Sequence, residues 1–114
     1  MQHPMSQVAV LVIDMLNTYR HEDAELLEVR HSAFYASSLG YLLGRREARR
    51  LILTGQVTEQ CILYTALDAY VRHFSVVVVP DAVAHIDPEL GDAALTMMHK
   101  NMHAEIVPAE KCLH

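Results

Sequence analysis

Residues 51–72 read LILTGQVTEQCILYTALDAYVR, and this stretch decides the fold. Its first four residues form a short apolar run that stops at Gly55, which is typical of a strand buried on both faces. From residue 58 to residue 72 the spacing becomes helical, with apolar side chains at Ile62, Ala66, Ala69 and Tyr70. The stretch therefore predicts a buried strand followed directly by a helix.

Strand-like runs recur on both sides of this stretch. Residues 8–13 and 76–79 are apolar and β-branched, and they stop at Asp14 and Pro80; residues 104–107 form a weaker run. Strands that alternate with helices predict βαβ units with right-handed crossovers. We expect an α/β fold of three layers, with a parallel sheet of about four strands.

Further helices are predicted between these strands. Residues 88–101 have helical spacing, with Asp87 and Pro88 as the cap and the first helical residue. Residues 21–30 are charged and are also predicted to be helical. Another helix is expected at residues 39–49, with Ser37 or Ser38 as its N-cap.

Length and composition limit the possible classes of protein. A chain of 114 residues is expected to form one domain around a single core, covering residues 1–114. The 52% of hydrophobic and 20% of charged residues are typical of a globular domain, and a net charge of −5 without a basic stripe argues against nucleic-acid binding. No apolar run approaches the roughly 20 residues of a membrane span, and no signal peptide is evident. With only two cysteines, a reducing cytoplasm is the expected location.

Three polar signals follow the predicted strands: Asp14, residues 55–61 and Asp81. Ligands of parallel α/β sheets bind beyond the carboxyl ends of the strands. There, Asp14 could take the thiol proton of Cys61, and the start of the helix could stabilise the thiolate and bind an oxyanion. The alternative is structural: a cysteine in an apolar helix is a common core residue, and an Asp after a strand is a common turn residue.

Four segments together resemble the isochorismatase-like family of cysteine hydrolases. They occur in the family's order and cover most of the chain: residues 11–17 (LVIDMLN), 53–61 followed by 65–69 (LTGQVTEQC and TALDA), 79–84 (VPDAVA) and 30–35 (RHSAFY).

The resemblance implies a small-molecule substrate with an amide-like carbonyl. Some members of the family hold a metal through an Asp and histidines in a segment that is missing here, so we expect no metal and no cofactor. Asp14 would be the general base and Cys61 the nucleophile. A cis peptide at Gln56–Val57 would turn backbone N–H groups of Gln56, Val57 and Thr58 toward the oxyanion.

Two departures from the family's pattern stand out. The family's catalytic lysine would fall at Glu28, within one position, and a carboxylate raises the pKa of a neighbouring thiol where a cation lowers it. Arg30 is a candidate substitute cation, although a guanidinium replaces a lysine poorly.

The second departure is length. About a dozen residues separate Asn17 from Arg30, too few for the strand, helix and strand that the family places there. Residues 8–13 are therefore expected at the edge of the sheet, where an apolar strand tends to associate. We expect a homo-oligomer, a dimer or larger, in which copies pair along this edge or exchange elements.

The eight histidines do not predict a metal site. His99 and His103 are four residues apart, but they lie at a predicted helix end far from the strand ends. They are interpreted as exposed histidines that a helix C-terminus favours.

Three hypotheses follow from these residues. The first is a cysteine hydrolase of a small amide or related C–N substrate, and the second is a non-catalytic family remnant that forms an oligomer or binds a partner. The third is an incomplete chain, shortened by a natural or engineered deletion. The sequence does not identify the substrate, because a shared fold does not determine one.

Overall fold

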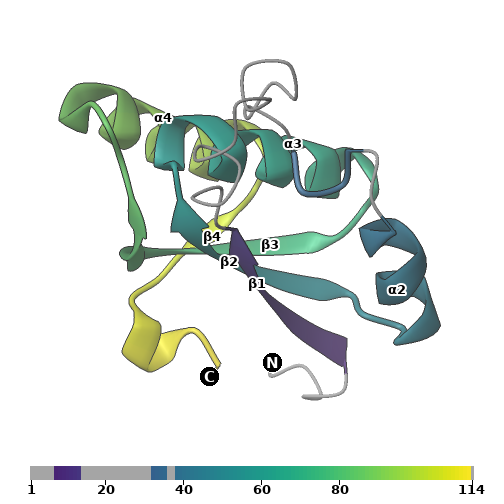
Figure 1. Ribbon diagram of the computed structural model, residues 1–114. Coiled ribbons are helices and arrows are strands. Elements are labelled where there is room, and N and C mark those ends of the chain that lie inside the picture. The colour runs from purple at the N-terminus through teal and green to yellow at the C-terminus, as the bar shows by residue number, and fades with distance from the viewer. Residues whose placement is uncertain (1–6, 14–31, 36–37, 114) are drawn as a thin grey trace.

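The computed structural model describes residues 7–13, 32–35 and 38–113. In these ranges four strands form one sheet: β1 (Val8–Ile13), β2 (Arg50–Gln56), β3 (Ser75–Ala84) and β4 (Glu105–Ile106). Their order is β1-β2-β3-β4, and every neighbouring pair is parallel (Figure 1). The predicted α/β class with a parallel sheet of about four strands is confirmed.

The helices lie in the connections between the strands. They are α2 (Leu39–Arg45), the π-helical turn η3 (Thr58–Ile62), α3 (Leu63–Val71), α4 (Pro88–Asn101) and the 3₁₀ turn η4 (Ala109–Lys111). The predicted helix at residues 88–101 is confirmed, and Asp87 caps it by accepting from the backbone N–H groups of Glu89 and Leu90. The helix predicted at residues 58–72 is observed as η3 and α3 in succession.

The two faces of the sheet are covered differently. Helices α3 and α4 lie on one face, and η4 lies on the other (Figure 1). The strands follow one another across the sheet in the order of the chain. Right-handed connections between strands in this order place their helices on the same face of the sheet.

The core follows from this arrangement, because side chains alternate between the faces along each strand. On the helical side Leu53 and Val78 pack with Ala66 and Met98. On the other side Ile52, Val77 and Val79 form a second cluster, which Val107 and Cys112 cover in part.

Strand β1 is an edge strand, as the sequence predicts. Its only neighbour in the described sheet is β2, with Ile13 opposite Gly55. Val10 is 56% exposed and Val12 is 76% exposed. Two large apolar side chains of this strand therefore remain in contact with solvent.

The predicted strand ends were wrong for β2 and β3, which continue past Gly55 and Pro80. Pairing shifts between Leu53 opposite Val78 and Gly55 opposite Val83, so β3 bulges between these two positions. A bulge tolerates a proline because no ladder N–H is needed there. Gly55 has φ 110°, and a Cβ at this position would collide with the backbone of Ile13.

Other predicted boundaries need smaller corrections. Helix α2 ends at Arg45, short of residue 49, because Glu47 takes a positive φ of 54° and Ala48 N–H bonds back to Leu43. Its N-cap is Ser38, whose side chain makes no capping hydrogen bond. Strand β4 is shorter than residues 104–107. The helix predicted at residues 21–30 lies outside the described residues.

Candidate active site

The candidate site begins where β2 ends. The Gln56–Val57 peptide is cis, as the resemblance implies. Val57 is extended, and helical geometry begins at Thr58. The chain thus turns from the carboxyl edge of the sheet directly into the helix that carries Cys61.

The first turn of this helix is wide. The Val57 carbonyl accepts hydrogen bonds from the N–H of Gln60 at 3.0 Å and of Ile62 at 3.1 Å, and the second of these spans five residues. Residues 58–71 form one continuous helical segment, which begins at the carboxyl edge of the sheet. The positive end of the helix dipole stabilises a thiolate at this position.

Cys61 lies in this first turn and is fully buried. It packs in the core on the helical side of the sheet, together with Ile13, Ile62 and Ala66. The fold therefore places the predicted nucleophile just after the carboxyl end of β2, in the same core cluster as Ile13 at the end of β1. Because its exposed fraction is 0%, a substrate reaches its sulfur only if neighbouring groups move apart.

Thr58 adds a second polar group at this turn. Its residue is 2% exposed, and within the described structure its Oγ1 is buried with no hydrogen-bond partner. A buried hydroxyl in this state costs about 1–3 kcal/mol. Thr58 was predicted for its backbone N–H, and its unpaired side chain is a feature that the sequence did not reveal.

Glu59 ties the start of the helix to the connection between β3 and α4. Its carboxylate accepts from the backbone N–H of Asp87 at 2.8 Å and of Ile86 at 3.2 Å. Burial alone would raise the pKa of Glu59. The backbone hydrogen bonds from Asp87, from Glu59 itself and from Ile86, together with the nearby His85, lower it by more, so the pKa lies below its usual value. Sequence reasoning assigned no role to Glu59, although an acidic residue in the first turn of a helix at a strand end was a usable signal.

Thr65 holds the segment that resembles the family's RHSAF stretch. The backbone N–H of Ala33 donates to Thr65 Oγ1 at 2.8 Å, and Thr65 lies one turn after Cys61. Phe34 is 5% exposed, and its ring lies 6.0 Å from that of Phe74. The guanidinium of Arg72 stacks 4.7 Å from the centre of the Phe34 ring. Residues 32–34 are thus fixed against the helix of the predicted nucleophile.

A cavity of about 420 Å³ opens at the carboxyl ends of β1, β2 and β3. It is lined by Val12, Ile13, Gly55, Gln56 and residues 81–84, and Cys61 is not part of its wall. The structure thus brings the carboxyl ends of β1, β2 and β3 together around one cavity, as the sequence predicts. Asp81 lies there too, but its carboxylate accepts a hydrogen bond from Ala109 N–H at 3.0 Å and so holds η4 in place.

Three predicted site residues, Asp14, Glu28 and Arg30, lie outside the described residues. Asp14 follows Ile13, which pairs with Gly55 on β2. The described stretch of residues 7–13 therefore ends beside β2, the strand that leads to Cys61.

Within residues 7–13, 32–35 and 38–113, no three His, Cys, Asp or Glu side chains are arranged to hold a metal ion. His99 Nδ1 lies 3.1 Å from the Ala104 carbonyl, in a contact at the end of α4. None of the helices in the described part of the chain is long and apolar enough to cross a membrane.

Comparison with known proteins identifies the family. The model of the isochorismatase domain matches residues 12–111. The uncharacterized isochorismatase family protein YaaI of Bacillus subtilis is 36% identical over 102 residues, which cover 88% of this chain and 56% of that protein. A probable inactive nicotinamidase of Arabidopsis thaliana, At3g16190, is 29% identical over 92 residues and is covered to 47%.

Solved structures agree with the sequence relatives. The crystal structure of the nicotinamidase/pyrazinamidase PncA from Bacillus subtilis superposes with a TM-score of 0.67 and 36% identity. The match covers 68% of this chain and 43% of that one, so the chain spans about half the length of the relatives it matches. With the family's domain matched over residues 12–111, this chain belongs to the isochorismatase family.

Proposed function

We propose that this protein is a cysteine hydrolase of a small amide or related C–N substrate, with Cys61 as the nucleophile and Asp14 as the general base. One observation carries the proposal: Cys61 lies in the first turn of the helix that follows β2, at the carboxyl edge of the sheet, and belongs to the same core cluster as Ile13, the last residue of β1. A solved neighbour is named a nicotinamidase/pyrazinamidase, so a heteroaromatic carboxamide is the first substrate to test.

The proposed reaction has two steps. The Asp14 carboxylate takes the thiol proton, the thiolate of Cys61 attacks the amide carbon, and ammonia or an amine leaves with a proton. Water then hydrolyses the thioester and releases the carboxylic acid. The oxyanion of each tetrahedral intermediate is bound by backbone N–H groups among Gln56, Val57 and Thr58 at the start of the helical segment.

Two features slow this reaction. Glu28 stands at the place of the family's lysine, and a carboxylate there disfavours the thiolate. Arg30 is the nearby cation in the sequence that could offset it. The complete burial of Cys61 adds the cost of opening the site before a substrate can bind.

A second candidate function is a non-catalytic family member that acts by binding. The full burial of Cys61 favours it, since a core cysteine needs no access to substrate. One relative is itself named a probable inactive nicotinamidase. In this case the exposed edge of β1 would be the functional surface, and a second copy of the chain the partner.

The test measures ammonia released from nicotinamide and pyrazinamide by the wild-type protein, Cys61→Ala and Asp14→Asn. The hydrolase proposal expects release by the wild-type protein that both substitutions abolish, while Cys112→Ser leaves it unchanged. Release that survives in Cys61→Ala would exclude this cysteine as the nucleophile. No release above background from a wider panel of small amides would favour the binding function.

Location and assembly complete the proposal. We propose a reducing cytoplasm, because neither cysteine is in a disulfide and the chain has only two. We further propose that residues 1–114 act as one domain and that two copies associate along the apolar edge of β1, with pairing or exchange of elements covering Val10 and Val12.

A further inference from the structure

The side chain of Thr58 has no partner in the fold. Among the side chains of residues 7–13, 32–35 and 38–113, its Oγ1 is the only buried nitrogen or oxygen atom without a hydrogen bond. The residue is 2% exposed, so bulk water does not reach this hydroxyl. A buried hydroxyl without a partner costs free energy, and native proteins keep few such groups. The fold therefore leaves one hydrogen-bonding group for a molecule from outside the chain.

The place of Thr58 in the helix explains why its hydroxyl is unbonded. A threonine at the N-cap position accepts a hydrogen bond from a backbone N–H two or three residues later. Here Val57 is the N-cap, in extended conformation, and Thr58 is the first helical residue. The Val57 carbonyl accepts from the N–H groups of Gln60 and Ile62. The hydroxyl thus lies one residue too late to cap the helix.

The other threonines that are withdrawn from solvent in the described chain do have partners. Thr54 donates to the Leu11 carbonyl at 3.0 Å, and Thr65 accepts from the Ala33 N–H at 2.8 Å. Thr65 lies on the buried side of the same helical segment as Thr58. The fold therefore pairs a buried hydroxyl one part of the way along this helix and leaves unpaired the one at its start.

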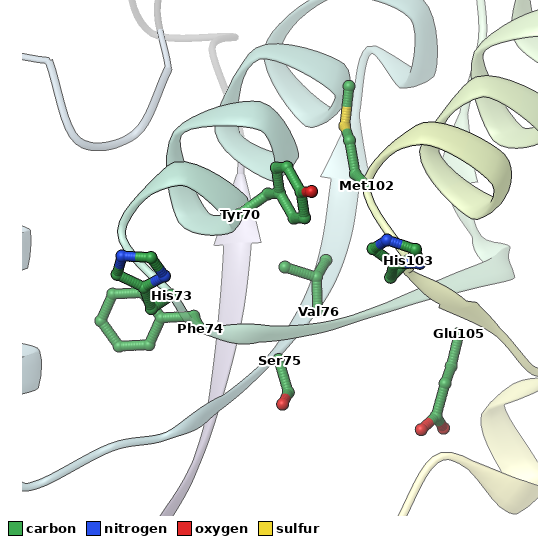
Figure 2. A pocket seen from close by; sticks show the side chains of 8 residues that line it. All are labelled: Tyr70, His73, Phe74, Ser75, Val76, Met102, His103 and Glu105. Atoms are coloured by element: carbon green, nitrogen blue, oxygen red, sulfur yellow. The ribbon is translucent and has the colours of Figure 1, made fainter.

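The cavity of about 280 Å³ at the amino ends of β3 and β4 offers no comparable group. Figure 2 shows its polar side chains Ser75 and Glu105 on the opposite side of β3 from Tyr70 and Met102. Arg50 holds the Glu105 carboxylate by hydrogen bonds of 2.9 Å and 3.2 Å. None of the described residues that line this cavity has a buried polar side-chain atom without a partner.

The surroundings of Thr58 favour an oxygen atom as its partner. The residue begins a helical segment of residues 58–71, and the positive end of the helix dipole attracts partial negative charge. The carboxylate of Glu59, the next residue, already accepts from the N–H groups of Ile86 and Asp87. Cys61 lies three positions after Thr58 and is buried on the same side of this turn. A carbonyl group brought to the sulfur therefore places its oxygen within the turn that carries the hydroxyl.

We infer that the Thr58 hydroxyl binds the carboxamide group of the substrate, by donating a hydrogen bond to its carbonyl oxygen. The bond strengthens when attack by Cys61 turns this oxygen into an oxyanion, because hydrogen bonds to charged acceptors are stronger. The inference rests on the proposed function, and it adds a side-chain donor to the backbone N–H groups named there. Thr58 and Cys61 are both buried, so one opening of the site has to expose both.

The first experiment compares the stability of two matched variants by urea unfolding. Thr58→Val should unfold at the same urea concentration as the wild type or at a higher one, because valine has the shape of threonine without the unpaired hydroxyl. Thr65→Val should unfold at a lower concentration, because it loses a bonded hydroxyl. A loss in Thr58→Val as large as that in Thr65→Val would show that the fold itself uses the Thr58 hydroxyl, and would overturn the inference.

The second experiment measures binding without turnover. In a Cys61→Ala background nicotinamide is titrated by NMR, and Thr58→Val should weaken its binding about 2- to 10-fold through the loss of one hydrogen bond. Thr58→Ser keeps a hydroxyl and should restore the affinity. Thr96→Val, at an exposed position of α4, is the control and should bind as the background does. Equal affinity in Thr58→Val, or no binding to the background at tens of millimolar nicotinamide, would overturn the inference.

The third experiment separates the role of Thr58 from hydrolysis itself. In the otherwise wild-type protein, Thr58→Val should lower kcat/KM for ammonia release about 100-fold, and Thr58→Ser should recover most of it. Unchanged turnover in Thr58→Val would exclude the hydroxyl as a donor to the oxyanion. If the wild-type protein releases no ammonia, the proposed hydrolysis fails, and the affinities in the Cys61→Ala background still decide whether Thr58 binds the carboxamide.

Discussion

The hydroxyl of Thr65 accepts a hydrogen bond from the backbone N–H of Ala33 at 2.8 Å, across 32 residues of sequence. Thr65 is fully buried and lies one turn after Cys61. One bond therefore connects the segment that follows the family's lysine position to the helix of the predicted nucleophile.

Replacing Thr65 by valine tests this connection. The substitution keeps the shape of the side chain and removes the acceptor, so we expect the free energy of unfolding to fall by about 1–3 kcal/mol. Urea unfolding followed by circular dichroism measures the change. Thr96→Val, at an exposed position of α4, is the control and should change the stability little. Equal stability of Thr65→Val and the wild type would show that the bond contributes nothing.

The carboxylate of Glu59 predicts a dependence of stability on pH. Its pKa in the folded protein lies below the usual value of 4.5, so its hydrogen bonds stabilise the fold above pH 4.5. This contribution is lost as the pH falls through the lowered pKa, because the protonated carboxyl group no longer carries the negative charge that strengthens these hydrogen bonds.

Urea unfolding of the wild type and of Glu59→Gln, at a series of pH values, measures the effect. The variant should be less stable at neutral pH, and the difference should shrink as the pH falls below 4.5. Glu110→Gln in the exposed turn η4 serves as the control for removing a charge. A difference that is the same at every pH would contradict the role of the carboxylate.

The thiol of Cys61 is the centre of the proposed function, and its reactivity can be measured directly. In a Cys112→Ser background we expect alkylation by iodoacetamide to be slow in the native protein, because Cys61 is fully buried, and to accelerate in denaturant. If the site is catalytic, the apparent pKa lies below the free-thiol value of about 8.5, and Asp14→Asn, which removes a carboxylate beside the thiol, lowers it further. An apparent pKa at or above that value, unchanged by Asp14→Asn, would favour the non-catalytic function.

The edge of β1 predicts association between copies. Sedimentation at micromolar concentration should show a dimer or larger species. Val12→Lys should shift it toward the monomer, because a charge on the edge strand opposes pairing. Val71→Lys, at a 57% exposed position of α3, is the matched control and should leave the assembly intact. A wild-type protein that sediments as a monomer would exclude an interface at this edge.

Local patterns in the sequence were enough to predict the class of fold. The apolar runs at residues 8–13, 51–54 and 76–79 alternate with helical spacing, and this order alone predicts a parallel sheet. The bounds of α4 were predicted because Asp87 and Pro88 start a helix by contacts within a few residues. The edge position of β1 was predicted from the number of residues between Asn17 and Arg30, which is too small for the strand, helix and strand that the family places there.

The tertiary structure alone decided the bulge of β3, the full burial of Cys61 and the contacts of Glu59 and Thr65. The bulge is a shift in the pairing of β3 with β2, between Leu53 opposite Val78 and Gly55 opposite Val83, and the sequence of β3 alone does not encode it. Glu59 meets Asp87 across 28 residues, and Thr65 meets Ala33 across 32. A local pattern predicts which elements form, because their hydrogen bonds and periodicity are local. The exposure and partners of a side chain depend on how those elements pack, and only the folded chain determines that.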